Sequence, residues 1–225
     1  MFKMISIAID GPGGAGKSSI AKALAERIGF IYVDTGALYR SIGLYMLENN
    51  VDLSDSNAIT GKLKDISVEL KYVDNNQRVI LCGKDVSEDI RKPEVSMAAS
   101  KVSAIPEVRE FLLSLQRDMA DKNNIIMDGR DIGTVVLPNA QIKMFLTASP
   151  EERAMRRYKE LIAKGEEVQY ETVLSELNER DYNDSHRSVA PLKPADDAAV
   201  IDTTGNNLEQ SVDMIMKFIA PKIKA

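Results

Sequence analysis

The chain has 225 residues, of which 44% are apolar and 28% are charged, and its formal net charge is −5. This composition is typical of a folded globular protein and excludes a disordered chain, and the acidic balance argues against nucleic acid or an anionic membrane as a partner. One cysteine and one histidine exclude an internal disulfide and a metal centre built from these residues. No apolar run approaches the roughly 20 residues of a membrane helix, and Asp10 interrupts the first apolar run too early for a signal peptide. We therefore expect a soluble, cytoplasmic protein.

The N-terminal pattern predicts an α/β domain with a parallel sheet. The apolar run 4–10 predicts a buried strand, a glycine-rich loop follows, and apolar positions at helical spacing predict a helix over 19–29 that stops at Gly29. Residues 30–34 predict a second strand, and residues 35–49 predict a second helix capped by Thr35. Strand, loop, helix, strand and helix in this order are typical of parallel α/β proteins.

The middle of the chain predicts a small antiparallel insert. Residues 66–73 alternate between apolar and polar, residues 74–77 (DNNQ) predict a turn, and residues 78–82 predict a second strand, with a short third strand after Gly83. One helix is expected to start near Pro93 and another at Pro106. We take about residues 61–105 as an inserted subdomain.

The remaining sequence returns to the core. Apolar runs predict three more buried strands, over 125–131, 142–148 and 198–204, and residues 206–220 predict a closing helix. We therefore expect five parallel strands in a single domain whose core comprises residues 1–60, 106–148 and 188–225. Two charged amphipathic helices joined at Gly165 fill residues 149–187.

Residues 11–18, GPGGAGKS, match the phosphate-binding pattern G-x-x-x-x-G-K-[ST] at every fixed position, between a predicted strand and a predicted helix. Glycines let backbone amides converge on phosphate, and the helix N-terminus adds partial positive charge. In such a loop Lys17 contacts the β- and γ-phosphates of a nucleotide and Ser18 coordinates Mg²⁺. The alternative is a glycine-rich turn without a ligand.

Two polar turns follow other predicted strands, and the carboxyl ends of parallel strands share one edge of a sheet. Residues 34–36 (DTG) open the second helix, in which Arg40 either contacts a second anion or is solvated. In residues 128–131 (DGRD), Asp128 is a candidate carboxylate on the Mg²⁺ side, and Arg130 is a candidate for binding a phosphate. Asp131 is a candidate acceptor of a hydrogen bond from a base. The alternative for this turn is a salt-bridged surface loop.

Arginines gather on the two helices of residues 149–187. The first helix places three on one face, Arg153, Arg156 and Arg157, and the second spaces charges at i, i+4 and i+7, Arg180, Asp184 and Arg187. Charge runs are usually solvated faces, but beside a phosphate loop these helices predict a lid that closes over transferring phosphates and excludes water. We interpret His186 as a polar surface or lid residue and Cys82 as a buried strand residue.

Together these motifs resemble the bacterial-type cytidylate kinase family: GPGGAGKSS, DTGALYR, MDGRDIGTVVLP, ERAMRR, ERDYNDSHR and APLKPADDAAVIDT, in this order over nearly the whole chain. The resemblance implies a P-loop three-layer α/β fold with a central five-stranded parallel sheet, a nucleoside-monophosphate-binding insert with a small antiparallel sheet, and a helical lid. It implies transfer of the ATP γ-phosphoryl group to CMP or dCMP, Mg²⁺ bound with ATP, and a monomer.

The resemblance also implies roles for individual residues. Ser100, Arg109 and Asp131 would read the cytosine, while Arg40, Arg130 and Arg187 would hold the CMP phosphate, with Thr35, Tyr39 and Asp184 near the ribose and phosphate. The ATP side would comprise Gly11, Pro12, Gly13, Gly14, Ala15, Gly16, Lys17, Ser18 and Ser19, with Arg153, Arg156 and Arg157 from the lid. The catalytic residues would be Lys17, Arg130, Arg180 and Arg187, with Ser18, and indirectly Asp128, on the metal. The family often has serine where this chain has Thr35, and the hydroxyl is retained.

Other classes of function make different demands on the sequence. A GTPase needs the tetrapeptide N-K-x-D, which does not occur here, and a nucleic-acid-binding module needs a basic surface. A kinase of another small metabolite, such as shikimate, is the nearest enzymatic alternative. An assay of ATP with CMP, UMP, AMP and shikimate distinguishes these possibilities.

Overall fold

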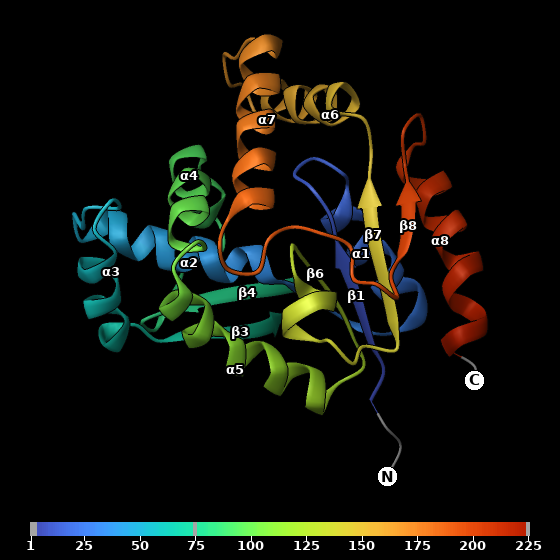
Figure 1. Ribbon diagram of the computed structural model, residues 1–225, viewed down its shortest axis with the longest axis horizontal. Helices are drawn as coiled ribbons and strands as arrows, with labels where there is room; N and C mark the ends of the chain where they lie inside the picture. The colour runs from blue at the N-terminus through green and yellow to red at the C-terminus, as the bar shows by residue number, and fades with distance from the viewer. Residues whose placement is uncertain (1–3, 74–75, 224–225) are drawn as a thin grey trace. The chain divides into compact units, whose positions relative to one another are not determined.

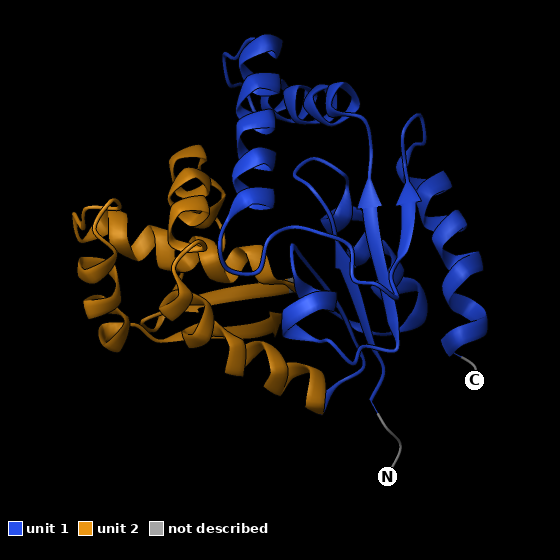
Figure 2. Cartoon of the chain, in the orientation of Figure 1, with its two compact units in different colours: residues 1–32, 122–225 blue, residues 33–121 orange. Residues whose placement is uncertain are grey.

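The computed structural model describes residues 4–73 and 76–223, and the predicted elements occur in the predicted order, with one helix that was not predicted, Ser56–Lys62 (Figure 1). The chain divides into two compact units, coloured separately in Figure 2: unit 1 comprises residues 1–32 and 122–225, and unit 2 comprises residues 33–121. Unit 2 is therefore longer than the expected insert at 61–105. Each unit has its own sheet and its own hydrophobic core.

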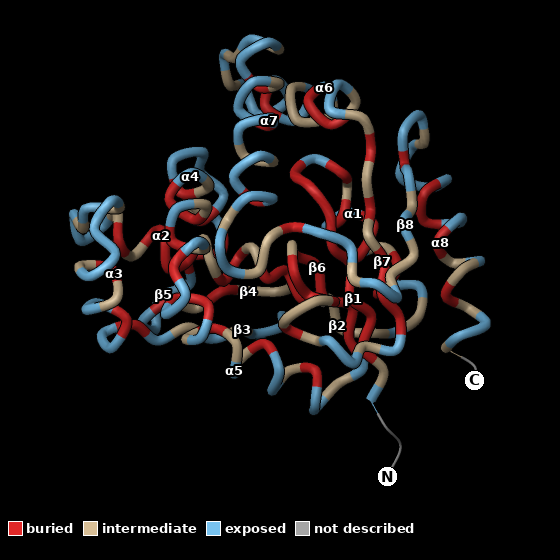
Figure 3. The backbone as a smooth tube through the Cα atoms, viewed as in Figure 1, coloured by how far each residue is buried: buried red, intermediate tan, exposed pale blue. Residues whose placement is uncertain are grey.

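A five-stranded sheet with the order β2-β6-β1-β7-β8 is the centre of the fold. Its strands are β1 (Ser6–Asp10), β2 (Ile31–Asp34), β6 (Ile125–Gly129), β7 (Ile142–Thr147) and β8 (Ala199–Asp202), and the chain passes into unit 2 within β2. The central strand β1 pairs in parallel with both β6 and β7. Every residue of β1 and β6 is buried, which explains their uninterrupted apolar runs (Figure 3). The five predicted parallel strands are confirmed.

Helices of unit 1 supply the rest of its core. α1 (Lys17–Ile28) and α8 (Leu208–Ile223) pack their apolar faces against β1 and β7, with Leu24, Met144 and Ile215 fully or almost fully buried. α6 (Pro150–Ala163) and α7 (Tyr170–His186) form a helical hairpin with a small core of its own, made of Ala154, Leu161, Val173 and Leu177. Among the described residues, no helix combines the length and apolar composition needed to cross a membrane.

Unit 2 contains a three-stranded antiparallel sheet, β3-β4-β5, and the helices packed on it. Its elements are α2 (Thr35–Glu48), α3 (Ser56–Lys62), β3 (Val68–Val73), β4 (Asn76–Leu81), β5 (Lys84–Asp85), α4 (Pro93–Val102) and α5 (Pro106–Lys122), the last residue of α5 belonging to unit 1. α2 and α4 approach closely at Gly43, where a Cβ atom would lie 2.9 Å from the Ala99 nitrogen. A shared core therefore fixes α2, α4 and α5 within this unit.

Three details differ from the sequence predictions or lie beyond the described residues. Thr35 is the first residue of α2 and not its cap, because Asp34 has extended backbone and its carboxylate accepts the Ala37 amide hydrogen at 2.9 Å. Cys82 is exposed and not buried in a strand, because it lies in the two-residue turn between β4 and β5, where its φ is 48°. Of the turn predicted at 74–77, residues 74–75 lie outside the described residues, and residues 76–77 open β4.

Candidate active site

The glycine-rich loop joins β1 to α1 in unit 1, and two close approaches explain its glycines. A Cβ atom on Gly11 would lie 2.0 Å from the Leu146 carbonyl oxygen, and one on Gly14 would lie 3.0 Å from the Cβ and carbonyl oxygen of Arg153. Gly16 is the N-cap of α1 with a φ of 83°, and no side chain caps the helix. The amides of the first turn therefore remain available to an anion, as phosphate binding requires.

Lys17 lies at the start of α1 and is buried, with only 6% of its surface exposed. Its Nζ donates a hydrogen bond to the Pro12 carbonyl oxygen at 2.7 Å, so the side chain folds back along the loop. Burial and, after it, the neighbouring Arg130 charge lower the pKa of Lys17 to about 7, against the opposing effect of Asp128. A buried cation in this position is suited to neutralising negative charge that a ligand brings into the loop.

Ser18 and Asp128 form the polar centre beside the loop. The Ser18 hydroxyl donates to Asp128 Oδ2 at 2.8 Å, and the Tyr32 hydroxyl donates to Asp128 Oδ1 at 3.0 Å. Oxygen donors of this kind suit Mg²⁺, which usually takes one or two protein oxygens and completes its shell with phosphate and water. The described part of the chain has no group of three or more acidic, histidine or cysteine side chains that could hold a metal ion.

Asp10 is a buried carboxylate that the sequence analysis did not include among the site residues. It lies opposite Gly129 in the sheet, and its two oxygens accept the backbone amide hydrogens of Ile132 and Gly133 at 2.7 and 2.8 Å. Burial raises the pKa of Asp10 to about 6, although both amides act in the opposite direction. Asp10 therefore fixes the chain directly after the DGRD turn. The sequence signal was its position, an acidic residue at the end of a buried strand and next to the glycine loop.

Ion pairs connect the DGRD turn with α7 and with Arg187, the residue directly after α7, within unit 1. Arg130 Nε donates to Asp184 Oδ2 at 2.8 Å, and Arg187 Nη2 lies 3.5 Å from Asp131 Oδ1. The Asp184 pKa lies below its ordinary value because three arginines, including Arg180, outweigh the effect of burial. The structure thus brings together five predicted site residues, Arg130, Asp131, Arg180, Asp184 and Arg187, in one cluster of alternating charge.

The three arginines of α6 have different surroundings. Arg153 is buried, and its guanidinium donates to the Gly13 carbonyl oxygen at 2.9 Å and pairs with Asp181 at 2.6 Å. Arg156 donates to the Thr203 carbonyl oxygen at 2.8 Å, and Arg157 pairs with Glu160 at 2.9 Å. Arg153 therefore connects the phosphate loop with α7 through Asp181, which the sequence analysis missed because nothing local distinguishes it from the other acidic residues of α7.

Unit 2 carries the other predicted site residues on three helices, with Thr35, Tyr39 and Arg40 on α2, Ser100 on α4 and Arg109 on α5. The Arg109 guanidinium lies over the Tyr39 ring, 5.8 Å from its centroid, and donates to the Ser103 carbonyl oxygen at 3.3 Å. Arg40 pairs with Asp34 at 2.8 Å, and Arg91 lies 3.5 Å from the same carboxylate. Neither Asp34 nor Arg91 was among the predicted site residues.

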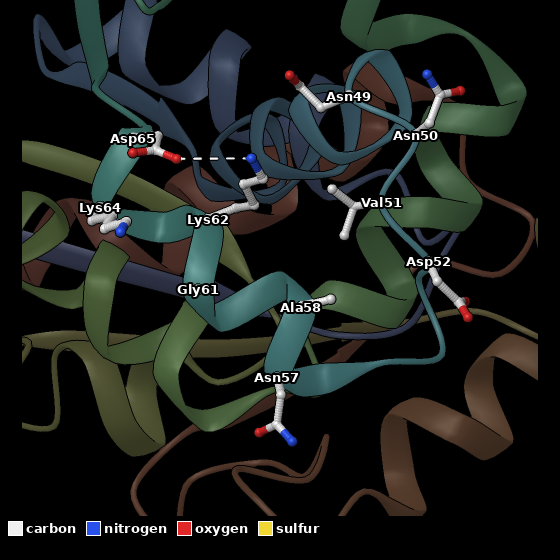
Figure 4. A pocket seen from close by; sticks show the side chains of 10 residues that line it. All are labelled: Asn49, Asn50, Val51, Asp52, Asn57, Ala58, Gly61, Lys62, Lys64 and Asp65. Carbon is white, nitrogen blue, oxygen red and sulfur yellow. Dashed lines mark ion pairs between the residues drawn. The ribbon is translucent and has the colours of Figure 1, made fainter.

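Unit 2 also has a hollow of about 520 Å³, shown in Figure 4, and none of these side chains is part of its lining. Polar and apolar residues of the α2–α3 connection, of α3 and of the turn after α3 line it, and Lys62 and Asp65 of this lining form an ion pair at 4.0 Å. Asn49, which lines the hollow, follows Arg40 by nine residues, so at about 1.5 Å per residue the two lie roughly 13 Å apart along the axis of α2. The hollow is therefore separate from the predicted site.

Known proteins are similar to this chain over nearly its full length. The family model described as cytidylate kinase matches residues 7–221. A cytidylate kinase of Caldicellulosiruptor bescii is 50% identical over 223 residues, covering 99% of each chain. A cytidylate kinase of Caldanaerobacter subterraneus subsp. tengcongensis is 52% identical over 222 residues, covering 98% of this chain and 96% of the relative.

A solved structure supports the fold alone. The crystal structure of an uncharacterized protein from Eubacterium ventriosum superposes with a TM-score of 0.53 at 15% identity, covering 96% of this chain and 99% of the other. The phosphate loop and its buried lysine are features that an ATP-dependent kinase requires. The chain therefore belongs to the cytidylate kinase family and is an ATP-dependent kinase.

Proposed function

We propose that this protein transfers the γ-phosphoryl group of ATP to CMP or dCMP and releases ADP and CDP or dCDP. In the reaction an oxygen of the acceptor phosphate forms a bond to the γ-phosphorus, and the bond from that phosphorus to the β–γ bridging oxygen breaks. The observation that carries the proposal is the buried Lys17 within a phosphate loop whose Ser18 contacts Asp128. The family membership supplies the acceptor class.

On the donor side, the loop amides and Lys17 bind the ATP phosphates, and Ser18, with Asp128 behind it, holds Mg²⁺. The metal supplies charge neutralisation on the β- and γ-phosphates when it is bound. Arg153, Arg156 and Arg157 belong to the ATP side. Arg153 has the clearest support, because it already contacts the loop at the Gly13 carbonyl oxygen.

On the acceptor side, arginines cancel the repulsion between two anionic substrates. Arg130 and Arg187 contact the acceptor phosphate, together with Arg40 of unit 2, and Arg180 stabilises the transferring group. Ser100, Arg109 and Asp131 recognise cytosine, whose O2 and N3 accept hydrogen bonds and whose amino group donates them. Thr35, Tyr39 and Asp184 lie near the ribose and phosphate. Phosphoryl transfer depends on such positioning and charge neutralisation more than on a strong base.

We also propose that three parts of the chain have different roles. Residues 61–105 bind the nucleoside monophosphate, and residues 149–187 close as a lid. The core beneath the lid comprises residues 1–60, 106–148 and 188–225. A monomer in the cytoplasm, with small nucleotides and neither nucleic acid nor membrane as partners, agrees with the acidic composition and with the family resemblance.

An acceptor assay tests the proposed function. ADP release is measured with ATP, Mg²⁺ and one acceptor at a time: CMP, dCMP, UMP, AMP or shikimate. We expect the highest kcat/KM with CMP or dCMP and loss of turnover when the metal is chelated, because the phosphate charges are then not neutralised. Absence of CMP-dependent ADP release, or a higher kcat/KM with shikimate, would refute the proposal.

A further inference from the structure

Asp34 caps α2 and is almost fully buried in unit 2, with 5% of its surface exposed. One carboxylate oxygen accepts the Ala37 amide hydrogen at 2.9 Å, which is the ordinary task of a cap. The other oxygen lies 2.8 Å from Arg40 Nη2 and 3.5 Å from Arg91 Nη1. A helix cap needs only the first contact, so the two arginines indicate a second task.

The backbone of Asp34 is fixed by the small sheet. Its amide donates to Gln77 Oε1 at 2.9 Å, and Gln77 Nε2 donates back to the Asp34 carbonyl oxygen at 3.4 Å. Gln77 lies on β4, far from Asp34 in sequence. Both the main chain and the side chain of Asp34 are therefore held in one position before any ligand binds.

The Arg40 side chain on α2 is also largely buried, next to Asp34. Only 18% of its side chain is exposed, and its buried Nε has no hydrogen-bond partner among the described residues. A Cβ atom on Gly36 would lie 3.0 Å from Arg40 Nη1 and 3.1 Å from Asp34 Oδ1. The glycine of the DTG motif therefore leaves the room that the Asp34–Arg40 pair occupies.

The charged groups around Asp34 have an excess of positive charge that an anionic ligand can neutralise. Burial alone would raise the Asp34 pKa, but Arg40 and Arg91 together with the Ala37 amide lower it, so the carboxylate is ionised. One carboxylate facing two guanidiniums leaves one positive charge uncompensated. This arrangement suits an anion that binds to arginines already held in place.

We propose that Asp34 is a positioning residue, which acts through Arg40 by holding its guanidinium ready for the phosphate group of the acceptor. This inference rests on the proposed function, in which Arg40 contacts that phosphate. The DTG motif then has a physical meaning: the aspartate orients the arginine six residues further along the chain, and the glycine makes space for the pair.

The test compares Asp34→Asn with a matched control. Asparagine is an equally good helix cap, so the variant removes the charge and keeps the cap. We expect KM for CMP to rise about tenfold, since the charge-assisted hydrogen bond that orders Arg40 is weakened, while KM for ATP stays within about twofold of the wild-type value. The control is Asp55→Asn, in the same unit, where Asp55 caps α3 by accepting the Asn57 and Ala58 amides at 2.9 and 3.0 Å and contacts no arginine among the described residues. It should leave both KM values unchanged.

A double-mutant cycle separates positioning from a merely structural role. In an Arg40→Ala background, Asp34→Asn should have no further effect on KM for CMP, because the residue through which it acts is gone. A second variant, Gly36→Ala, keeps the Asp34 carboxylate and crowds the pair, because the new Cβ atom would lie 3.0 Å from Arg40 Nη1 and 3.1 Å from Asp34 Oδ1. It should raise KM for CMP about fivefold although alanine favours the helix, and it serves as the test if Asp34→Asn does not fold.

Three results would overturn the inference: an unchanged KM for CMP in Asp34→Asn, an equal rise in KM for both substrates, or the same loss with and without Arg40. These outcomes are distinct from failure of the proposed function. If the wild-type enzyme preferred another phosphate-bearing acceptor, the same cycle read with the KM of that acceptor would still decide the role of Asp34.

Discussion

Replacing Lys17 by methionine should make the ligand-free protein more stable and the enzyme inactive. Methionine keeps the length of the side chain and removes the buried charge. The wild-type protein holds this lysine in a site that lowers its pKa from 10.5 to about 7, because burial and Arg130 disfavour the charged form. Lysine at this position therefore serves the reaction at the expense of the fold.

The magnitude follows from linkage. A pKa difference of one unit corresponds to about 1.4 kcal/mol, so the depressed pKa destabilises the folded state by about 4 kcal/mol at pH 7. Methionine also loses the hydrogen bond to the Pro12 carbonyl oxygen, worth about 1 kcal/mol. The net gain should be about 3 kcal/mol at pH 7. Between pH 7 and 10.5 the native state releases a proton that the unfolded state retains, so the wild type gains stability with rising pH and the advantage of the variant disappears.

The assay is urea unfolding of the ligand-free protein at pH 7 and pH 10, followed by circular dichroism, together with steady-state turnover. Lys22→Met, an exposed lysine of the same helix, is the matched control and should change stability by less than about 0.5 kcal/mol. Turnover of Lys17→Met should fall about 10³-fold or more, since the charge stabilises the transition state. A variant no more stable than the wild type at pH 7, or equally stabilised at both pH values, would refute the stability argument, and near-normal turnover would refute the assignment of the phosphate loop.

Two further predictions concern substrate recognition and motion. Asp131→Ala should weaken CMP binding by about 1–3 kcal/mol, since a buried polar contact to the base is lost, and leave ATP binding nearly unchanged. Calorimetry with each nucleotide alone measures this, and equal losses for both would contradict a role in reading the base. Hydrogen exchange should show protection of residues 61–105 with CMP alone, and the fullest protection of residues 149–187 with both nucleotides, because closure excludes water from the reacting phosphates. Protection of both regions that is already complete without ligand would argue for a rigid, preformed cleft.

Local sequence determined most of the secondary structure and the chemistry of the loop. The buried strands β1 and β6 were recognisable as continuous apolar runs, and the hairpin of unit 2 as an alternating run followed by a turn. The glycines, Lys17 and Ser18 occur at fixed spacing, so their pattern is legible without a structure. Both kinds of signal depend on neighbours within a few residues of one another.

Tertiary structure decided which charges meet. Asp10 holds amides more than 120 positions away, Arg153 reaches Gly13 over 140 positions, and the Arg130–Asp184 pair spans 54 positions. Asp34 likewise receives Arg91 from another segment of unit 2, and its cap contact alone would not have distinguished it from Thr35. Electrostatic contacts leave no periodicity in a sequence, because a carboxylate is equally compatible with solvent and with a distant guanidinium. The sequence alone therefore determined the strands, the helices and the phosphate loop, whereas the tertiary packing determined which carboxylate orients which arginine.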